Sequence, residues 1–121
     1  MPFIQIDYTN NLVDQGAFEP CVLVQEMNRT LLATGQFGDD DIKTLARGSD
    51  VYARSSQARN KAFMCVTVSL LSGRTHEVKH EISMAVMEML RAQVKAIDGL
   101  ETQVSVNMRD MDRDSFVKVI F

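Results

Sequence analysis

The residue with the clearest chemical potential is the proline that directly follows the first methionine. Small second residues allow Met1 to be removed, and Pro2 would then carry a free secondary amine. Such an amine is a base and a nucleophile, whereas the nitrogen of an internal proline is neither. A free α-amino group has a pKa of about 8, which suits a group that takes up and releases protons near neutral pH. An apolar setting and nearby cations would lower that pKa, so the pattern predicts proton-transfer chemistry at Pro2.

Basic residues that could bind an anion are unevenly spread along a chain whose net charge is −3. Segment 42–61 holds five of them against a single acidic residue, Asp50. This pattern fits a small-anion site, an RNA contact or a solvated loop, and surface charges most often only solubilise. The net charge argues against a general affinity for nucleic acid or anionic lipid. The five basic residues are Lys43, Arg47, Arg54, Arg59 and Lys61, and Arg74 follows after the next apolar run.

The composition is typical of one soluble domain, with 121 residues, 45% hydrophobic and 24% charged. No apolar run approaches the roughly 18 residues that a membrane helix needs, and polar residues stand where a signal peptide would be apolar. We therefore expect a single domain over residues 1–121, located in the cytoplasm and without a membrane partner. Cys21 and Cys65 lack the spacing of metal ligands and are expected to be buried free thiols.

The first half of the chain predicts a strand, a helix and a second strand. Residues 2–8 are β-branched and apolar enough for a strand. The helix begins either with Asp14 as its N-cap or near residues 18–19, with Pro20 in the first turn. It ends at Gly35, and residues 42–46 form a short second strand.

The second half repeats this order after a loop. Residues 62–71 alternate clearly, and both faces carry apolar or small side chains, so this strand is expected to be central. Thr75 is expected to cap a long amphipathic helix that Gly99 closes. The remaining predicted pieces are a loop over 47–61 with a brief extended piece at 51–52, a strand over 102–108 and a terminal strand over 116–121.

Residues 2–46 and 62–108 therefore share the order strand, turn, helix, glycine and strand. This internal β-α-β duplication predicts an α/β fold in two layers, a mixed four-stranded sheet with two helices packed on one face. The other face of the sheet would then need cover, because residues 62–71 are apolar on more than one face. Self-association would provide that cover.

A duplicated β-α-β chain of this length with a proline after Met1 resembles the tautomerase superfamily, and in particular the 5-carboxymethyl-2-hydroxymuconate isomerases. Beyond Pro2, the resemblance rests on four short stretches whose order and spacing run along nearly the whole chain. These are residues 30–35 (TLLATG), 41–44 (DIKT), 62–64 (AFM) and 72–75 (SGRT).

The resemblance implies a homotrimer in which Pro2 is the acid/base catalyst and Arg74 and Lys43 bind the substrate's carboxylates. Phe63 is a candidate for an apolar wall that excludes water. The implied activity is keto–enol proton transfer on a small unsaturated 2-hydroxy or 2-oxo acid, most closely a hydroxymuconate-type dicarboxylate from aromatic catabolism. No cofactor or metal is implied.

The chain departs from the family pattern at its second strand, where the isomerases carry Ile-Arg-Ser-Arg and this chain has Ile-Lys-Thr-Leu. One cation is changed conservatively to Lys43, and the other is lost at Leu45. Arginine binds carboxylates through two parallel hydrogen bonds and lysine through a point charge, so anion recognition should be relaxed or redirected. Arg47, farther along the strand, is a candidate replacement.

Two other functions fit the same residues. Pro2 could serve a hydratase or dehalogenase that acts on an unsaturated acid. Alternatively, the chain could be a non-catalytic trimer that binds a small anion or a protein partner, with the proline serving only to start a strand.

Overall fold

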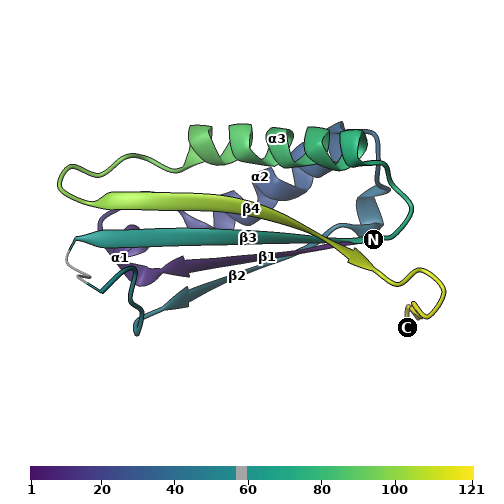
Figure 1. Ribbon diagram of the computed structural model, residues 1–121, viewed down its shortest axis with the longest axis horizontal. Helices are drawn as coiled ribbons and strands as arrows, with labels where there is room; N and C mark the ends of the chain where they lie inside the picture. The colour runs from purple at the N-terminus through teal and green to yellow at the C-terminus, as the bar shows by residue number, and fades with distance from the viewer. Residues whose placement is uncertain (57–59) are drawn as a thin grey trace.

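Four strands form one mixed sheet in the order β2-β1-β3-β4. The computed structural model describes residues 1–56 and 60–121 (Figure 1). Strands β1 (Pro2–Thr9) and β2 (Lys43–Ser49) pair in parallel. Strands β3 (Lys61–Leu71) and β4 (Glu101–Met111) do the same, and β1 joins the two pairs by running antiparallel to β3.

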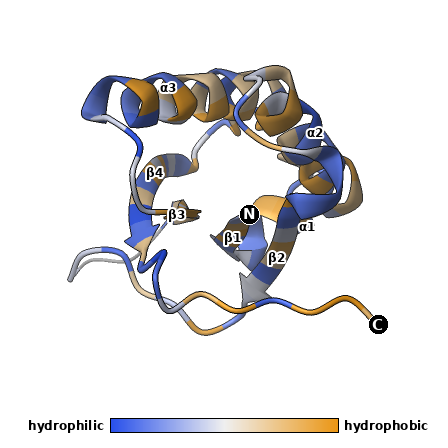
Figure 2. Cartoon of the chain, turned by 90° about the vertical axis from the view of Figure 1, so that its right-hand side faces the viewer, coloured by the Kyte–Doolittle hydropathy of each residue, from blue (hydrophilic) through white to orange (hydrophobic). Residues whose placement is uncertain are grey.

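Two long helices, α2 (Pro20–Ala33) and α3 (His76–Gln93), lie side by side on one face of this sheet (Figures 1 and 2). Each helix connects two parallel strands, so β1-α2-β2 and β3-α3-β4 are the two β-α-β units. The predicted duplication and the predicted fold class are therefore confirmed. Two short helical pieces complete the fold, α1 (Asn10–Asp14) and η1 (Asp39–Asp41).

The core lies between the sheet and the two helices. Alternate strand residues point toward the helices, and helix residues three or four positions apart point back, as the two periodicities require. The fully buried members include Ile4 and Ile6 in β1, Leu23, Met27 and Leu31 in α2, Met64, Val66, Val68 and Leu70 in β3, and Ile82, Val86 and Leu90 in α3.

Helix α2 offers a matched pair of leucines for testing this core. Leu31 has an exposed fraction of 0%, whereas its neighbour Leu32 is 42% exposed. We expect Leu31→Ala to lower the free energy of unfolding by about 2–5 kcal/mol, because it removes buried methyl groups and leaves a cavity. Leu32→Ala should lower it by about 0.5 kcal/mol or less. Urea unfolding of both variants measures this, and equal losses would contradict the packing described here.

The start of α2 follows the second of the two predicted alternatives. Pro20 occupies the first turn, and the Glu19 side chain caps the helix by accepting a hydrogen bond from the Cys21 N–H at 3.4 Å. A cap at Asp14 is wrong, because residues 10–14 form α1 and Gly16 then takes a φ of 75° to redirect the chain. At the other end Gly35 follows the Thr34 cap with a φ of 76°, as predicted.

Helix α3 is shorter than predicted and does not reach Gly99. Val94 adopts an extended backbone, and the N–H of Lys95 donates to the Ala17 carbonyl at 2.8 Å. This contact takes the chain toward the loop after α1, so the helix ends at Gln93. Strands β2 and β4 extend past their predicted ends at residues 46 and 108.

The predicted terminal strand over 116–121 is wrong. Residues 112–121 contain no strand, and this C-terminal segment crosses the helix-free side of the sheet near the N-terminus (Figure 2). Residues 51–52, expected as a brief extended piece within a loop, belong to no strand of the sheet. Part of the predicted loop, residues 57–59, lies outside the described residues.

The helix-free face of the sheet is more polar than predicted. Gln5, Thr67 and Ser69 lie there half-buried, and Cys65 is exposed among them. The expectation of buried thiols is therefore wrong for Cys65, and also for Cys21, which is exposed in the first turn of α2. In the described part of the chain, no helix combines the length and apolar character needed to cross a membrane.

Candidate functional site

The sheet brings Pro2 and Lys43 to the same end of the molecule. Pro2 is buried at the start of β1, opposite Leu70 of β3. Lys43 begins β2 and pairs with Phe3, so it lies one strand away from the N-terminus. In this structure Met1 acylates the Pro2 nitrogen, and the free amine belongs to Met1.

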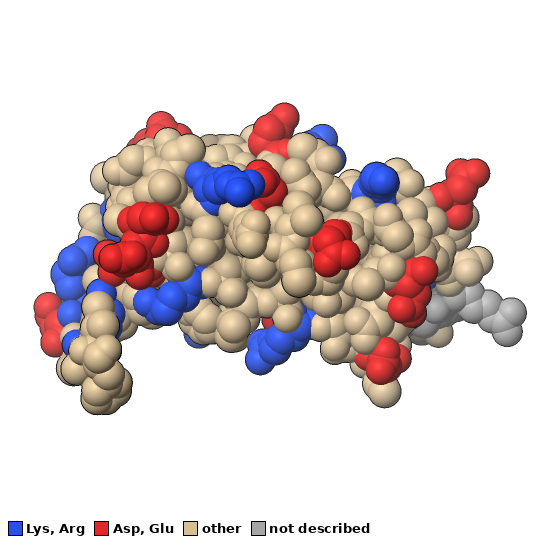
Figure 3. Space-filling view, turned by 180° about the vertical axis from the view of Figure 1, so that it is seen from behind, with Lys and Arg blue, Asp and Glu red and all other residues tan. Residues whose placement is uncertain are grey.

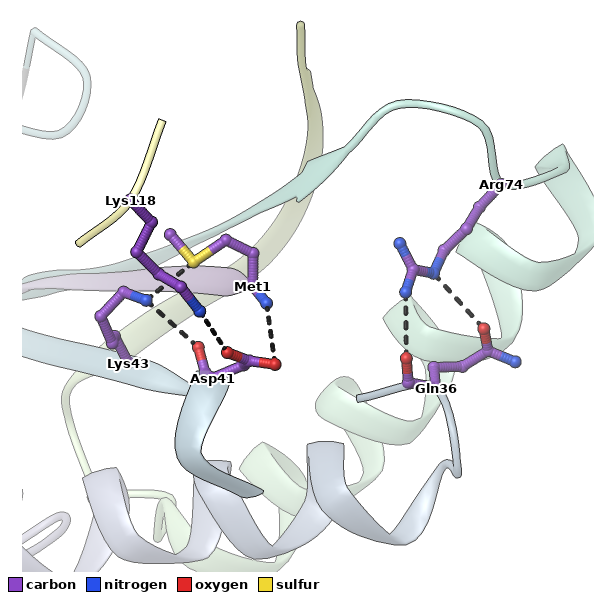
Figure 4. A network of polar contacts seen from close by, with 6 residues as sticks. All are labelled: Met1, Gln36, Asp41, Lys43, Arg74 and Lys118. Atoms are coloured by element: carbon purple, nitrogen blue, oxygen red, sulfur yellow. Dashed lines mark hydrogen bonds and ion pairs between the residues drawn. The ribbon is translucent and has the colours of Figure 1, made fainter. Parts of the chain in front are cut away.

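Asp41 stands at the centre of a polar network around that amine (Figure 4). Its Oδ2 atom lies 3.8 Å from the Met1 amine, and its Oδ1 atom accepts a hydrogen bond from Lys118 Nζ at 2.7 Å. Lys43 Nζ donates to the Asp41 carbonyl at 3.3 Å and lies 2.7 Å from the Met1 sulfur. The network therefore joins the start of β1, the start of β2 and the C-terminal segment.

The Met1 side chain occupies the centre of this site. It is only 10% exposed, and its sulfur contacts Lys43. Removal of Met1 would therefore do two things at once. It would free the Pro2 amine, and it would clear the space beside Lys43 and Asp41 in which a small molecule could reach that amine.

Arg74 is held by the loop that follows α2. Its Nη2 donates to the Gln36 carbonyl at 3.0 Å and its Nε donates to Gln36 Oε1 at 3.3 Å. The guanidinium also lies over the Phe37 ring, 4.8 Å from its centroid, where cation–π attraction fixes its plane. Burial, and then the nearby charge of Arg113, lower the pKa of Arg74 from its ordinary value. An arginine remains a cation under these conditions, so Arg74 is an oriented positive charge.

The surroundings favour the neutral form of the N-terminal amine. Burial lowers the pKa of the Met1 amine, the Asp41 carboxylate opposes this change, and the charges of Lys43, Lys118 and Arg74 reinforce it. The hydrogen bond from Lys118, followed by the charge of the amine, lowers the pKa of Asp41 and keeps it a carboxylate. A neutral amine can accept a proton, and the neighbouring cations can attract an anionic molecule to it.

Arg47 and Phe63 lie away from this end of the sheet. Arg47 is four residues beyond Lys43, about 13 Å along the strand, and its Nε donates to Asp7 Oδ1 at 3.2 Å. Phe63 is seven residues from Leu70, about 23 Å along β3, and packs edge-to-face against Tyr52. Within one chain, the structure thus groups Pro2 with Lys43 and Arg74 and separates the other two predicted residues from them.

The remaining basic residues of segment 42–61 do not form one anion-binding patch in the described part of the chain. Arg54 and Lys61 both pair with Glu101. Arg54 also donates to the Ala62 and Glu101 carbonyls, at 3.0 Å in each case, which ties the loop to β3 and β4. Arg59 lies outside the described residues.

Four residues of the network were missed from the sequence: Gln36, Phe37, Asp41 and Lys118. Three consecutive aspartates at 39–41 are typical of a solvated turn, and nothing in the pattern distinguishes the last of them. Lys118 had one signal, because it is the only charged residue in the apolar stretch 116–121. That stretch was interpreted as a strand, which hid the contact.

A family model for 5-carboxymethyl-2-hydroxymuconate isomerase matches residues 2–119. The chain belongs to this family. The resemblance predicted from the sequence is thereby confirmed, and membership of the 5-carboxymethyl-2-hydroxymuconate isomerase family identifies the chain as an isomerase. No curated protein matches the sequence closely enough to count as a relative.

Solved structures agree with the family in fold. A 5-carboxymethyl-2-hydroxymuconate isomerase from Deinococcus radiodurans R1 has a TM-score of 0.80 and 24% identity, over 98% of this chain and 88% of that one. A 5-carboxymethyl-2-hydroxymuconate delta-isomerase has a TM-score of 0.75 and 14% identity, and the match covers 100% of this chain and 88% of that one. A fused 4-OT described as a symmetric trimer has a TM-score of 0.70 and 18% identity, and the match covers 94% of this chain and 89% of that one.

Proposed function

We propose that this isomerase catalyses keto–enol proton transfer on a small unsaturated 2-hydroxy or 2-oxo dicarboxylic acid of the hydroxymuconate class. The observation that carries the proposal is the grouping of Lys43 and Arg74 around the amine end of β1 in a member of the 5-carboxymethyl-2-hydroxymuconate isomerase family. The family supports the reaction type, and the two cations support an anionic substrate.

Pro2 acts first as a base and then as an acid in this proposal. After removal of Met1, the neutral Pro2 amine takes a proton from the substrate's hydroxyl group or acidic carbon. Lys43 and Arg74 hold the carboxylates and stabilise the negative charge that develops on the dienolate oxygen. The protonated amine then returns the proton to a carbon farther along the conjugated chain, which completes the isomerisation and regenerates the base.

The reaction can be followed directly by ultraviolet absorbance with 2-hydroxymuconate as substrate. Ketonisation shortens the conjugated system, so the absorbance of the dienol decreases as the ketone forms. We expect turnover by protein whose intact mass shows that Met1 is absent. If the dienol absorbance decreases at the same rate with and without that protein, the result argues against the proposal.

Asp41 should set the pH at which the enzyme becomes active. Because the base must be neutral, kcat/KM is expected to rise with pH through the pKa of the Pro2 amine. Asp41 raises the pKa of the amine at this end of the chain, so Asp41→Asn should move the low-pH limb of the profile to lower pH. Asp40→Asn, on an exposed neighbour, should leave the limb in place. A shift to higher pH in the Asp41 variant, or equal shifts in both variants, would contradict this role.

We further propose a homotrimer, in line with the trimeric fused 4-OT of similar fold. The exposed helix-free face would contribute to the subunit contacts. Arg47 and Phe63 would then be available to the site of a neighbouring subunit, which accounts for their distance from Pro2 in one chain. Light scattering should give the mass of three chains. A cytoplasmic location and a role in the catabolism of aromatic compounds stay predictions.

A further inference from the structure

The C-terminal segment, residues 112–121, exposes its apolar side chains and directs its lysine toward the protein. Val117 and Val119 are 89% and 70% exposed, whereas the Lys118 side chain between them is 41% exposed and bonds to Asp41. Ile120 and Phe121 are exposed as well, so Lys118 is the side chain of this stretch that an ion pair holds to the protein. Asp41 therefore holds the Lys118 ammonium close to the N-terminal amine.

This segment is also fixed at its beginning. Arg113 Nε donates to the Ser72 carbonyl at 2.8 Å, two residues before Arg74, and Ser115 Oγ donates to Asp112 Oδ2 at 2.7 Å. The segment thus runs from the loop that carries Arg74 to the turn that precedes Lys43. Figure 3 shows basic and acidic side chains next to one another at this end of the molecule, beside the uncharged end of the segment.

The two candidate substrate-binding cations, Lys43 and Arg74, have a third positive charge beside them. Figure 4 shows Met1 between Arg74 on one side and Lys43 with Lys118 on the other. Strand β2 presents Leu45 where the family pattern has its second arginine, and Leu45 is exposed and uncharged. Lys118 adds a second positive charge beside Lys43, and it comes from the opposite end of the chain.

We propose that Lys118 is a substrate-binding residue that contacts a carboxylate of the molecule bound beside Pro2, in place of the cation lost at Leu45. This inference rests on the proposed function. An ammonium group has three donors, and Lys118 uses one of them on Asp41 in the described network, so two remain for a substrate carboxylate. Asp41 acts as a positioning residue, because it holds the ammonium beside the amine and beside Lys43.

The test compares Lys118→Ala with Lys95→Ala, a matched change at an exposed lysine after the far end of α3. Two quantities are measured: KM and kcat for 2-hydroxymuconate, and the Kd of adipate, a saturated six-carbon dicarboxylate that cannot tautomerise. We expect Lys118→Ala to raise both KM and the adipate Kd about tenfold, equivalent to about 1.4 kcal/mol, and to change kcat less than about twofold. Lys118→Arg should restore most of the affinity, and Lys95→Ala should match the parent.

The outcomes separate this inference from the proposed function. If the parent turns over its substrate and Lys118→Ala binds adipate as tightly as the parent does, the role of Lys118 is overturned while the proposed function stands. The role of Lys118 is also overturned if Lys95→Ala loses as much affinity for adipate as Lys118→Ala does. If the parent neither turns over 2-hydroxymuconate nor binds adipate, both proposals fail. Adipate binding that weakens only in Lys118→Ala supports the inference even for a substrate other than 2-hydroxymuconate.

Discussion

Pro2→Ala is expected to lower kcat/KM for ketonisation of 2-hydroxymuconate by about 100-fold. A positioned acid or base typically contributes about 10²–10⁴-fold to such a reaction. The expected loss lies at the lower end, because the alanine variant keeps an amine at the chain end once Met1 is removed. What it loses is the ring that makes the amine secondary and fixes the position of its nitrogen at the buried start of β1. Steady-state kinetics on protein of verified N-terminal mass measures the effect.

The other proline of the chain is the matched control for this experiment. Pro20 lies in the first turn of α2, on the crossover helix and away from the amine. Pro20→Ala should retain parental kcat/KM. Both variants should keep the number of subunits of the parent, which light scattering measures. Full activity in Pro2→Ala, with Met1 removed, would show that the proline has no part in catalysis.

Arg74→Ala is expected to lower kcat/KM by about 10- to 100-fold. Hydrogen bonds to charged groups contribute about 1.5–3 kcal/mol, and each 1.4 kcal/mol corresponds to about a factor of ten. The loss should appear mainly in KM if Arg74 only holds a carboxylate, and in kcat as well if its charge also stabilises the dienolate. The kcat and KM values of the variant therefore distinguish the two roles.

Two further substitutions sharpen the test of Arg74. Arg91→Ala removes an exposed arginine from the last turn of α3 and should leave the kinetics unchanged. Arg74→Lys keeps the charge but loses the planar group that stacks on Phe37 and bonds to Gln36, so intermediate activity is expected. Parental activity in both Arg74 variants would remove this residue from the site.

The architecture could be predicted because local patterns and long-range pairing agree. Residues 62–71 alternate with period two, and the residues after Thr75 repeat at three- and four-residue steps, so β3 and α3 were identifiable. The duplication of this order then determined the pairing, because each parallel pair needs a crossover that packs a helix on the sheet. Pro2 and Lys43 could be placed together on the same grounds, since both begin neighbouring strands.

The polar network of the site and the ends of some elements depended on tertiary contacts that no local sequence pattern indicates. Asp41 and Lys118 are 77 residues apart in the sequence, and their ion pair exists only because the C-terminal segment crosses the sheet. Residues 116–121 have strong strand propensity, yet they pair with no strand in the described part of the chain. Similarly, α3 stops at Gln93 because Lys95 bonds to Ala17, a tertiary contact that overrides the helical pattern of the sequence.

The central claim is that the amine of Pro2 is the catalytic base, and one preparation can test it before and after Met1 is removed. Untagged protein that retains Met1 is assayed with 2-hydroxymuconate, treated with methionine aminopeptidase, checked by intact mass and assayed again. Turnover should be absent at first and should appear in proportion to the fraction that has lost one methionine. Equal turnover in both forms, or none after complete removal, would contradict the claim.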